Sequence, residues 1–293
     1  GSYALIVSQR GEVAKFDGWI FTSDLSDSDD FYSDYRCSID WHSSGIWCVI
    51  TGYRSGSPYY CIWRYDGATF VTYSLRQMPF GVEWRSDGMY CLVVGSAGEV
   101  VQYDGVSLLY RSTATSRKLW DVGWKPDGSY ALIVSQRGEL LKFDGSTFTY
   151  SSTGDSDDFY GDYRCSVDWH PYGWYALITG YHSGSPYYCI WRYDGVTSTR
   201  LSLRCMPWGV SWKANASYAL IVGSAGETIT YDGSVLSYIS SSSSLTLWDI
   251  AWKPDSSYAL IVSQSGEVLR FDGRNFIHTS TGDSHDFYSD YKC

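Results

Sequence analysis

Three copies of an acidic segment, about 128 residues apart, hold the densest group of potential ligand side chains in the chain. The carboxylates that could bind a cation are Asp27, Asp29 and Asp30 in the first copy, Asp155, Asp157 and Asp158 in the second, and Asp283 and Asp286 in the third, where His285 replaces one aspartate. Ca²⁺ takes about six to eight oxygen ligands, so we keep these residues as weak calcium-ligand candidates and predict no other cofactor. The spacing is not that of an EF-hand loop. Two alternatives stay open, a solvated acidic loop and a surface that recognises a basic partner.

These acidic segments also set the charge of the protein, which has a formal net charge of −10. They hold 11 of its 32 acidic residues, and without them 22 basic residues would face 21 acidic ones. Nucleic-acid affinity rests on neutralising phosphates, and anionic membrane surfaces attract basic segments, so the charge disfavours both. Apolar runs such as Tyr218–Val222 have the length of a strand, whereas a membrane helix needs about 20 residues. The sequence therefore predicts neither a nucleic-acid partner nor membrane insertion.

A second set of candidate binding residues is aromatic and occurs in two copies. Its members are Tyr53, Tyr59, Tyr60, Arg76 and Phe80 in the first copy, and Tyr181, Tyr187, Tyr188, Arg204 and Trp208 in the second. Exposed aromatic rings beside carboxylates suit a protein partner or a sugar ring, because each ring offers a flat apolar face and a polar edge. The alternative is that these rings seal one repeat against the next.

The sequence holds no complete catalytic motif: there is no Ser-His-Asp arrangement, Gly-rich phosphate loop or HExxH helix. Carboxylates that precede a tryptophan, Asp40, Glu83 and Asp168, are the candidates for a hydrolase site. Their counterparts in the other repeats, Gly123, Ser211 and Ala251, cannot ionise. We therefore predict that the protein is not an enzyme.

The elements that position these residues follow from an internal repeat. An aromatic-Asp-Gly triplet closes each of seven repeats, with its aspartate at Asp17, Asp66, Asp104, Asp144, Asp194, Asp232 and Asp272. A tryptophan opens six of them, at Trp41, Trp84, Trp124, Trp169, Trp212 and Trp252. The repeats span approximately residues 1–37, 38–80, 81–120, 121–165, 166–208, 209–248 and 249–293. Self-similarity at such a period indicates a repeat architecture, and we expect one domain over 1–293.

Each repeat contains four segments with strand character. In the fourth, they are Asp121–Trp124, Ser129–Ser135, Glu139–Phe143 and a more polar outer segment, Phe148–Ser151. No stretch has sustained helical periodicity. Four strands in about 40–45 residues are typical of a propeller blade, so the sequence predicts an all-β, seven-bladed propeller of four-stranded antiparallel blades.

The run from Trp124 to Asp144 resembles a WD40 repeat in which Phe-Asp or Tyr-Asp replaces the closing Trp-Asp. The resemblance covers the chain in seven copies and implies a propeller fold. The Gly-His dipeptide of WD40 repeats is absent, so we describe the repeats as WD40-like, and the resemblance implies no particular partner. The first repeat lacks the Trp-bearing strand. Its blade is therefore expected to have three strands, or its closing residues to lie outside this sequence.

Residues that recur in every repeat are expected to serve the fold. The Asp-Gly aspartates are predicted to cap turn amides. Most cysteines follow the repeat and are predicted to be free, structural thiols. His42 and His170 align with Lys and Arg in other repeats and are expected to be solvated.

These observations predict a non-catalytic scaffold, which we expect to be extracytoplasmic, that binds a protein partner or assembles with itself through its acidic and Tyr-rich loops. The alternative is a lectin-like carbohydrate-binding module, with or without calcium. A third is a hydrolase with carboxylates in a central channel.

Overall fold

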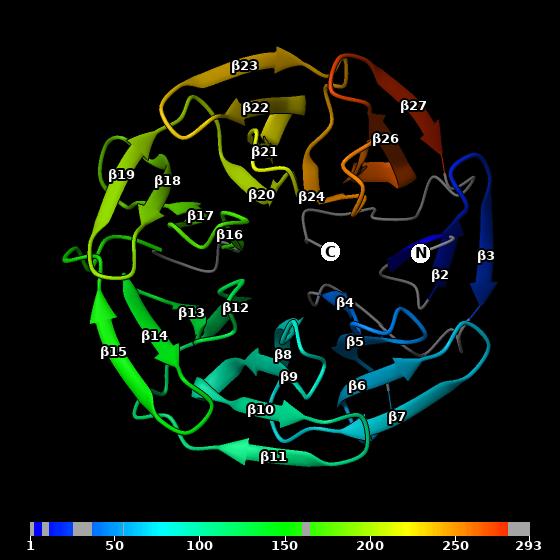
Figure 1. The fold of residues 1–293 in the computed structure, drawn as a ribbon, viewed down its shortest axis with the longest axis vertical. Helices are drawn as coiled ribbons and strands as arrows, with labels where there is room; N and C mark the ends of the chain where they lie inside the picture. Colours follow the sequence, from blue (N-terminus) through cyan, green and yellow to red (C-terminus); the bar gives the residue numbers. More distant parts are fainter. Residues whose placement is uncertain (1–2, 8–11, 26–36, 55, 160–164, 281–293) are drawn as a thin grey trace. The chain divides into compact units, whose positions relative to one another are not determined.

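The computed structural model of the chain describes residues 3–7, 12–25, 37–54, 56–159 and 165–280. These residues form six four-stranded antiparallel sheets and one three-stranded sheet, which are the blades of a seven-bladed β-propeller (Figure 1). The all-β class and the seven blades predicted from the WD40-like repeats are confirmed, and within the described residues the first blade has three strands.

The strands follow one another in chain order across every blade. Blades 1 to 3 contain β1 (Ala4–Val7), β2 (Glu12–Phe16) and β3 (Phe21–Leu25); β4 (Ile39–Trp41), β5 (Cys48–Tyr53), β6 (Tyr60–Tyr65) and β7 (Phe70–Ser74); and β8 (Pro79–Trp84), β9 (Cys91–Gly95), β10 (Val100–Tyr103) and β11 (Leu108–Arg111). Blades 4 and 5 contain β12 (Leu119–Trp124), β13 (Ala131–Ser135), β14 (Glu139–Phe143) and β15 (Phe148–Ser152), then β16 (Val167–Trp169), β17 (Ala176–Tyr181), β18 (Tyr188–Tyr193) and β19 (Ser198–Ser202). Blades 6 and 7 contain β20 (Pro207–Trp212), β21 (Ala219–Gly223), β22 (Glu227–Tyr231) and β23 (Leu236–Ser240), then β24 (Leu247–Trp252), β25 (Ala259–Ser263), β26 (Glu267–Phe271) and β27 (Phe276–Ser280). Three single-turn 3₁₀ helices, η1 (Ser96–Gly98), η2 (Ser224–Gly226) and η3 (Gln264–Gly266), join the second and third strands of blades 3, 6 and 7.

Blade 4 illustrates how the strand pattern positions side chains. β13 pairs with β14 in a register that places Ala131 opposite Phe143, and every residue of β13 is buried. The outer strand β15 has three exposed and two partly buried residues, as expected for a strand with one face in solvent. β12 starts at Leu119, two residues before the predicted start, because Leu119 and Trp120 are buried and extend the strand.

The chain divides into two compact units, Gly1–Val122 with Thr281–Cys293, and Gly123–Ser280. In each unit the hydrophobic core lies between successive blades. Val49 and Ile62 of blade 2 pack with Val93 of blade 3 in the first unit, and Leu177 of blade 5 packs with Ile221 of blade 6 in the second. Figure 1 shows the blades of the second unit following one another, with β15, β19, β23 and β27 along its outer side. Packing of blade against blade therefore buries both faces of the second and third strands.

The aromatic-Asp-Gly triplets form turns between the third and fourth strands. Asp144 Oδ1 accepts hydrogen bonds from the amides of Ser146 and Thr147, at 2.8 Å each. The same pair of amide bonds occurs in all seven turns. Backbone hydrogen bonds to these carboxylates hold the pKa of all seven aspartates below the usual value. The predicted capping role is confirmed.

The glycine of the triplet is required by both conformation and packing. Gly233 has a φ of +102°, which L side chains rarely adopt, and a Cβ built there would lie 2.9 Å from the hydroxyl of Tyr175 in the preceding blade. Gly67 and Gly195 stand in the same relation to Tyr3 and Tyr130. In these joints the earlier blade therefore inserts a tyrosine against the turn of the next blade.

In the described part of the chain, the six joints between consecutive blades come in three kinds, and each kind occurs twice. Between blades 1 and 2, and again between blades 4 and 5, a lysine of the earlier blade, Lys15 or Lys142, donates to the carbonyl of Gly67 or Gly195. Between blades 2 and 3, and again between blades 5 and 6, Asp40 or Asp168 accepts from the amide of Trp84 or Trp212, both at 2.6 Å. Between blades 3 and 4, and again between blades 6 and 7, Gly81 or Gly209 lies against Asp121 or Asp249, and an added Cβ would be 3.0 Å from that residue's Cα. The three-blade period of the sequence is therefore also a period of contacts.

Seven cysteines, Cys37, Cys48, Cys61, Cys91, Cys165, Cys189 and Cys205, are free thiols, as predicted, and Cys293 lies outside the described residues. Burial raises the pKa of Cys48 and Cys205 to about 12, so these thiols are poor nucleophiles.

Among the described residues, no helix is long and apolar enough to cross a membrane.

Candidate functional site

The acidic loop that joins β15 to β16 is docked onto blade 5. Asp158 is 3% exposed and Phe159 is buried, with its ring 4.6 Å from that of Trp191 on β18. Phe159 has a φ of +54°, an uncommon conformation for a bulky residue that burial and stacking hold in place. This loop is therefore ordered by the blade beneath it, at least over Asp155–Phe159, and its carboxylates are not all solvated.

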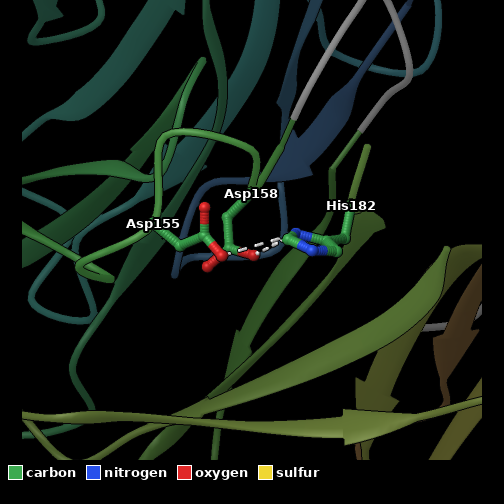
Figure 2. A group of neighbouring side chains, drawn as sticks. All are labelled: Asp155, Asp158 and His182. Atoms are coloured by element: carbon green, nitrogen blue, oxygen red, sulfur yellow. Dashed lines mark hydrogen bonds and ion pairs between the residues drawn. The ribbon is translucent and has the colours of Figure 1, made fainter. Parts of the chain in front are cut away.

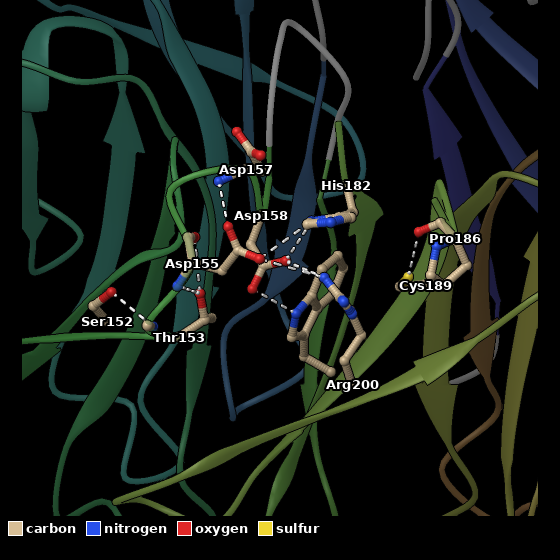
Figure 3. Close-up of polar contacts among 11 residues, drawn as sticks. Ser152, Thr153, Asp155, Asp157, Asp158, His182, Pro186, Cys189 and Arg200 are labelled. Carbon is tan, nitrogen blue, oxygen red and sulfur yellow. Dashed lines mark hydrogen bonds and ion pairs between the residues drawn. The ribbon is translucent and has the colours of Figure 1, made fainter. Parts of the chain in front are cut away.

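Asp158 is the centre of the polar contacts in this loop (Figure 3). Its Oδ2 accepts a hydrogen bond of 2.9 Å from the indole Nε1 of Trp191. Its Oδ1 lies 3.0 Å from Nδ1 of His182 and 3.3 Å from a guanidinium nitrogen of Arg200. Trp191 and Arg200 are opposite one another in the β18–β19 pairing, so both side chains lie on the same face of the blade.

Asp155 adds a second carboxylate to the group (Figure 2). Its Oδ1 accepts from the amide of Asp157 at 2.9 Å, and its Oδ2 lies 3.9 Å from His182 Nδ1 and 3.6 Å from Arg200. One donor atom from each of Asp155, Asp158 and His182 falls within 4.8 Å of the others, which makes these three residues the described group with metal-ligand character. Two carboxylates and one imidazole provide fewer oxygens than Ca²⁺ takes, and Arg200 already neutralises them.

The other predicted calcium ligands differ in placement. Asp157 is exposed, and its backbone carbonyl accepts from the amide of Ser183 at 3.0 Å. Asp27, Asp29, Asp30, Asp283 and Asp286 lie outside the described residues.

The acidic loop contacts the Tyr-rich hairpin between β17 and β18. Asp158 and His182 form an antiparallel bridge, which joins the Asp157–Ser183 hydrogen bond in fastening the loop to the hairpin. In blade 5 the acidic loop and the Tyr-rich hairpin therefore lie side by side on one face. The two carboxylates and the imidazole thus hold the base of the hairpin.

The Tyr-rich hairpins of blades 2 and 5, Tyr53–Tyr60 and Tyr181–Tyr188, present the same pair of rings. Tyr187 is 49% exposed and lies nearly parallel to Tyr181, with 6.0 Å between ring centroids and 14° between planes. Tyr59 is 50% exposed and pairs with Tyr53 at 5.8 Å and 15°. Tyr60 and Tyr188 are partly buried and lie at 60° to the inner tyrosine of each pair.

The remaining predicted binding residues make contacts with neighbouring blades. Phe80 and Trp208 are buried, and their rings contact those of Trp120 and Trp248 at 5.5 Å and 5.4 Å. Arg76 and Arg204 are exposed and lie over the rings of Tyr110 and Tyr238, at 3.9 Å and 4.2 Å. The burial of Phe80 and Trp208 agrees with the alternative role given above, in which these rings seal one repeat against the next.

Asp40 and Asp168, two of the three carboxylates that precede a tryptophan, are part of the joints between blades. Asp40 accepts from the amides of both Trp41 and Trp84, and burial raises its pKa to about 7. Asp168 makes the matching bond to Trp212, and Glu83 is partly buried on β8. Asp40 and Asp168 therefore each use an oxygen to hold the next blade.

A second aromatic group, at the other end of blade 5, was not among the binding residues predicted from the sequence. Trp174 is 64% exposed and stacks on His170, with 4.6 Å between ring centroids and 14° between ring planes. Tyr172 lies beside Trp174 and is also largely exposed. His170 is buried, so its predicted solvation is wrong. Burial and the nearby Arg192 lower the pKa of its imidazole, which stacks as a neutral ring. The sequence feature that could have identified this group is a turn with the sequence Pro-Tyr-Gly-Trp, where the matching turn of blade 4 has Pro-Asp-Gly-Ser.

Comparison with known proteins extends this picture only at the level of fold. No protein-family model and no curated protein matches the chain. A functionally unknown protein from Desulfotomaculum acetoxidans has a TM-score of 0.72 at 12% identity, over 97% of this chain and 96% of its own. YCF48 bound to D1 peptide has a TM-score of 0.69 at 13% identity, over 92% and 89% of the two chains. Hydrazine synthase of Kuenenia stuttgartiensis has a TM-score of 0.67 at 14% identity, over 80% and 76%. A peptide-bound protein and an enzyme thus share the architecture, and the chain is a seven-bladed β-propeller whose function its fold does not decide.

Proposed function

We propose that this propeller is a non-catalytic scaffold that binds a protein partner through the paired tyrosines of its two Tyr-rich hairpins. The observation that carries the proposal is the exposed, parallel ring pair, Tyr181–Tyr187 in blade 5 and Tyr53–Tyr59 in blade 2. Tyrosine is enriched among residues that dominate protein–protein binding energy, because it offers a large apolar face with a hydrogen-bonding edge.

Preorganisation of the hairpin supports this role. Stacking on Tyr181 restricts the ring of Tyr187 before any partner arrives, and the contacts of His182 and Ser183 hold the base of the hairpin. A side chain that is already ordered loses less conformational entropy on binding. One of the similar structures, YCF48, is bound to D1 peptide, which is in keeping with such a role.

The roles of the carboxylates favour binding over catalysis. Asp158 is bonded to Trp191, His182 and Arg200, and Asp40 and Asp168 are bonded to the backbone of the next blade. These bonds commit oxygens of Asp158, Asp40 and Asp168 to the framework of the blades, which favours a structural role for them over one in general acid–base catalysis.

A peptide-display experiment tests the proposal. Random peptides displayed on phage are selected on the wild-type protein, and the affinity of synthetic copies is compared with Tyr187→Ala, Tyr59→Ala and the double variant. Tyr150→Ala is the matched control, because Tyr150 is also an exposed tyrosine but lies on the outer strand β15. We expect a loss of about 10-fold or more in the double variant and none in the control, since hot-spot tyrosines contribute about 2 kcal/mol or more. Equal affinity for wild type and double variant would refute the role of the hairpins.

The same experiment also tests two other roles of these rings, carbohydrate binding and self-assembly. A tyrosine with one open face also suits a sugar ring, so a glycan array in calcium and in chelator accompanies the peptide selection. Sugar-specific binding that disappears in chelator and in Tyr187→Ala would favour the calcium-assisted lectin over a protein partner. Sedimentation at increasing protein concentration tests assembly with a second copy, which Tyr59→Ala/Tyr187→Ala should weaken if the hairpins mediate it.

A further inference from the structure

We propose that Asp155, Asp158 and His182 form a binding site for a divalent transition-metal ion of the Zn²⁺ class, in which the ion replaces Arg200 as the counter-charge of the two carboxylates. This site does not depend on the function proposed above.

Each carboxylate is held by one oxygen and presents the other to a common point. Trp191 donates to Oδ2 of Asp158, which leaves Oδ1 toward His182, and the amide of Asp157 donates to Oδ1 of Asp155, which leaves Oδ2 toward the same imidazole. Figure 2 shows the two carboxylates facing His182 from the acidic loop. Hydrogen bonds to the non-ligating atoms are how outer-shell groups orient metal ligands in proteins.

The separations between donor atoms fit a small coordination sphere. His182 Nδ1 lies 3.0 Å from Asp158 Oδ1 and 3.9 Å from Asp155 Oδ2. Zinc bonds to nitrogen and oxygen of about 2.0–2.2 Å place tetrahedral ligands about 3.4 Å apart, between these two values. One donor atom from each of the three residues lies within 4.8 Å of the other two, so side-chain displacements of about 1 Å or less would give three zinc ligands, with a fourth position open to solvent.

The donor types select the metal. An imidazole with two carboxylates suits Zn²⁺ and similar ions, whereas Ca²⁺ and Mg²⁺ prefer oxygen ligands alone. His182 and Asp158 are buried at 6% and 3% exposure, whereas the side chain of Asp155 is 44% exposed, so solvent and the ion reach the site from the side of Asp155.

Arg200 is the residue that the ion must displace. Its guanidinium lies 3.3 Å and 3.6 Å from the two presented oxygens, and its side chain is 33% exposed, so it can leave the carboxylates for solvent. The site is particular to blade 5, because the repeat places Arg54 at the position of His182 and Thr72 at the position of Arg200 in blade 2.

Zn²⁺ binding to the full chain tests the proposal, by isothermal titration with Zn²⁺ and by visible absorption of Co²⁺ as a coordination probe. Asp155→Asn and His182→Ala should each weaken Zn²⁺ binding about 10-fold or more, and Trp191→Phe should weaken it about 10–100-fold as an outer-shell change. Arg200→Thr should strengthen binding several-fold, because it removes the competing cation and introduces the residue of blade 2. Co²⁺ should give an intense tetrahedral absorption band in wild type and Arg200→Thr that His182→Ala lacks.

His42→Ala is the matched control, since His42 is a partly exposed histidine of blade 2 and should not affect the titration. Asp155→Asn and Arg200→Thr change partly exposed side chains, so they test the site even if His182→Ala impairs folding. The proposal is overturned if neither wild type nor Arg200→Thr binds Zn²⁺ up to 1 mM (about −4 kcal/mol of binding free energy). It is equally overturned if Asp155→Asn and Arg200→Thr both bind Zn²⁺ as wild type does.

Discussion

Replacing Asp158 by alanine should destabilise the protein far more than the same change at Asp157 in the same loop. Asp158 is the acceptor for the buried indole of Trp191 and for the buried imidazole of His182, at 2.9 Å and 3.0 Å. Leaving a buried donor without its acceptor costs about 1–3 kcal/mol, so two such donors together cost about 2–6 kcal/mol. Arg200 adds little, because water can solvate its partly exposed guanidinium. Asp157 has an exposed side chain, and its removal should change the free energy of unfolding by less than about 0.5 kcal/mol.

Urea unfolding followed by tryptophan fluorescence measures both variants, and hydrogen exchange at the Ser183 amide reports on the loop itself. Asp158→Ala should expose that amide by releasing the loop, whereas Asp157→Ala should leave it protected, since the bond uses the Asp157 carbonyl. Asp158→Asn should recover part of the loss, because its amide oxygen can still accept from Trp191. If Asp158→Ala and Asp157→Ala unfold within 0.5 kcal/mol of one another, the buried contacts of Asp158 do not stabilise the fold as argued.

The other predictions concern the joints between blades and the Asp-Gly turns. Asp40 has its pKa raised by burial to about 7, so between pH 4 and pH 7 the folded state keeps a proton that the unfolded state releases, and stability should fall with rising pH by at most about 4 kcal/mol. Asp40→Asn should remove this decline, and an unchanged pH profile in urea titrations would contradict it. Asp194→Ala loses the two amide bonds to Val196 and Thr197 and should lower the unfolding free energy by about 1 kcal/mol. Since the pKa of Asp194 is lowered, its contribution is present above pH 4 and disappears as pH falls through the folded-state value. Gly233→Ala should cost about 1–3 kcal/mol, more than Gly154→Ala, because both have positive φ but only Gly233 would place its Cβ against a neighbour, and equal losses would argue that conformation alone matters.

Fold class and blade number could be predicted because the information for them is local and repeated seven times. The third strand of blade 4, Glu139–Phe143, has the predicted bounds, since a glycine turn and an Asp-Gly turn delimit it. The start of β12 was placed two residues late because Leu119 and Trp120 follow a loop, and their burial depends on a neighbouring blade. Capping by the Asp-Gly aspartates was predictable for the same reason, since the acceptor and its amides are two and three residues apart.

The candidate site was only partly predictable, because its contacts join segments that are distant in sequence. The acidic loop and the Tyr-rich hairpin were both identified, but the pairing of Asp158 with His182, Trp191 and Arg200 spans 24 to 42 residues. His182 aligns with Arg54 of blade 2, so nothing in the sequence indicated that its imidazole is buried. The burial of Phe80 and Trp208 likewise depends on which side of an interblade joint each ring faces.

Because each kind of joint recurs three blades further along the chain, the gene could gain or lose a block of three blades without creating a new kind of joint. Unequal recombination between the first and second copies of the three-blade block would remove or add about 128 codons in register. At the new boundary a lysine still meets a glycine carbonyl, or an aspartate still meets a tryptophan amide, because both partners are supplied by the equivalent positions. A chain with three blades fewer or three blades more would thus keep each of the three kinds of joint that the described residues show.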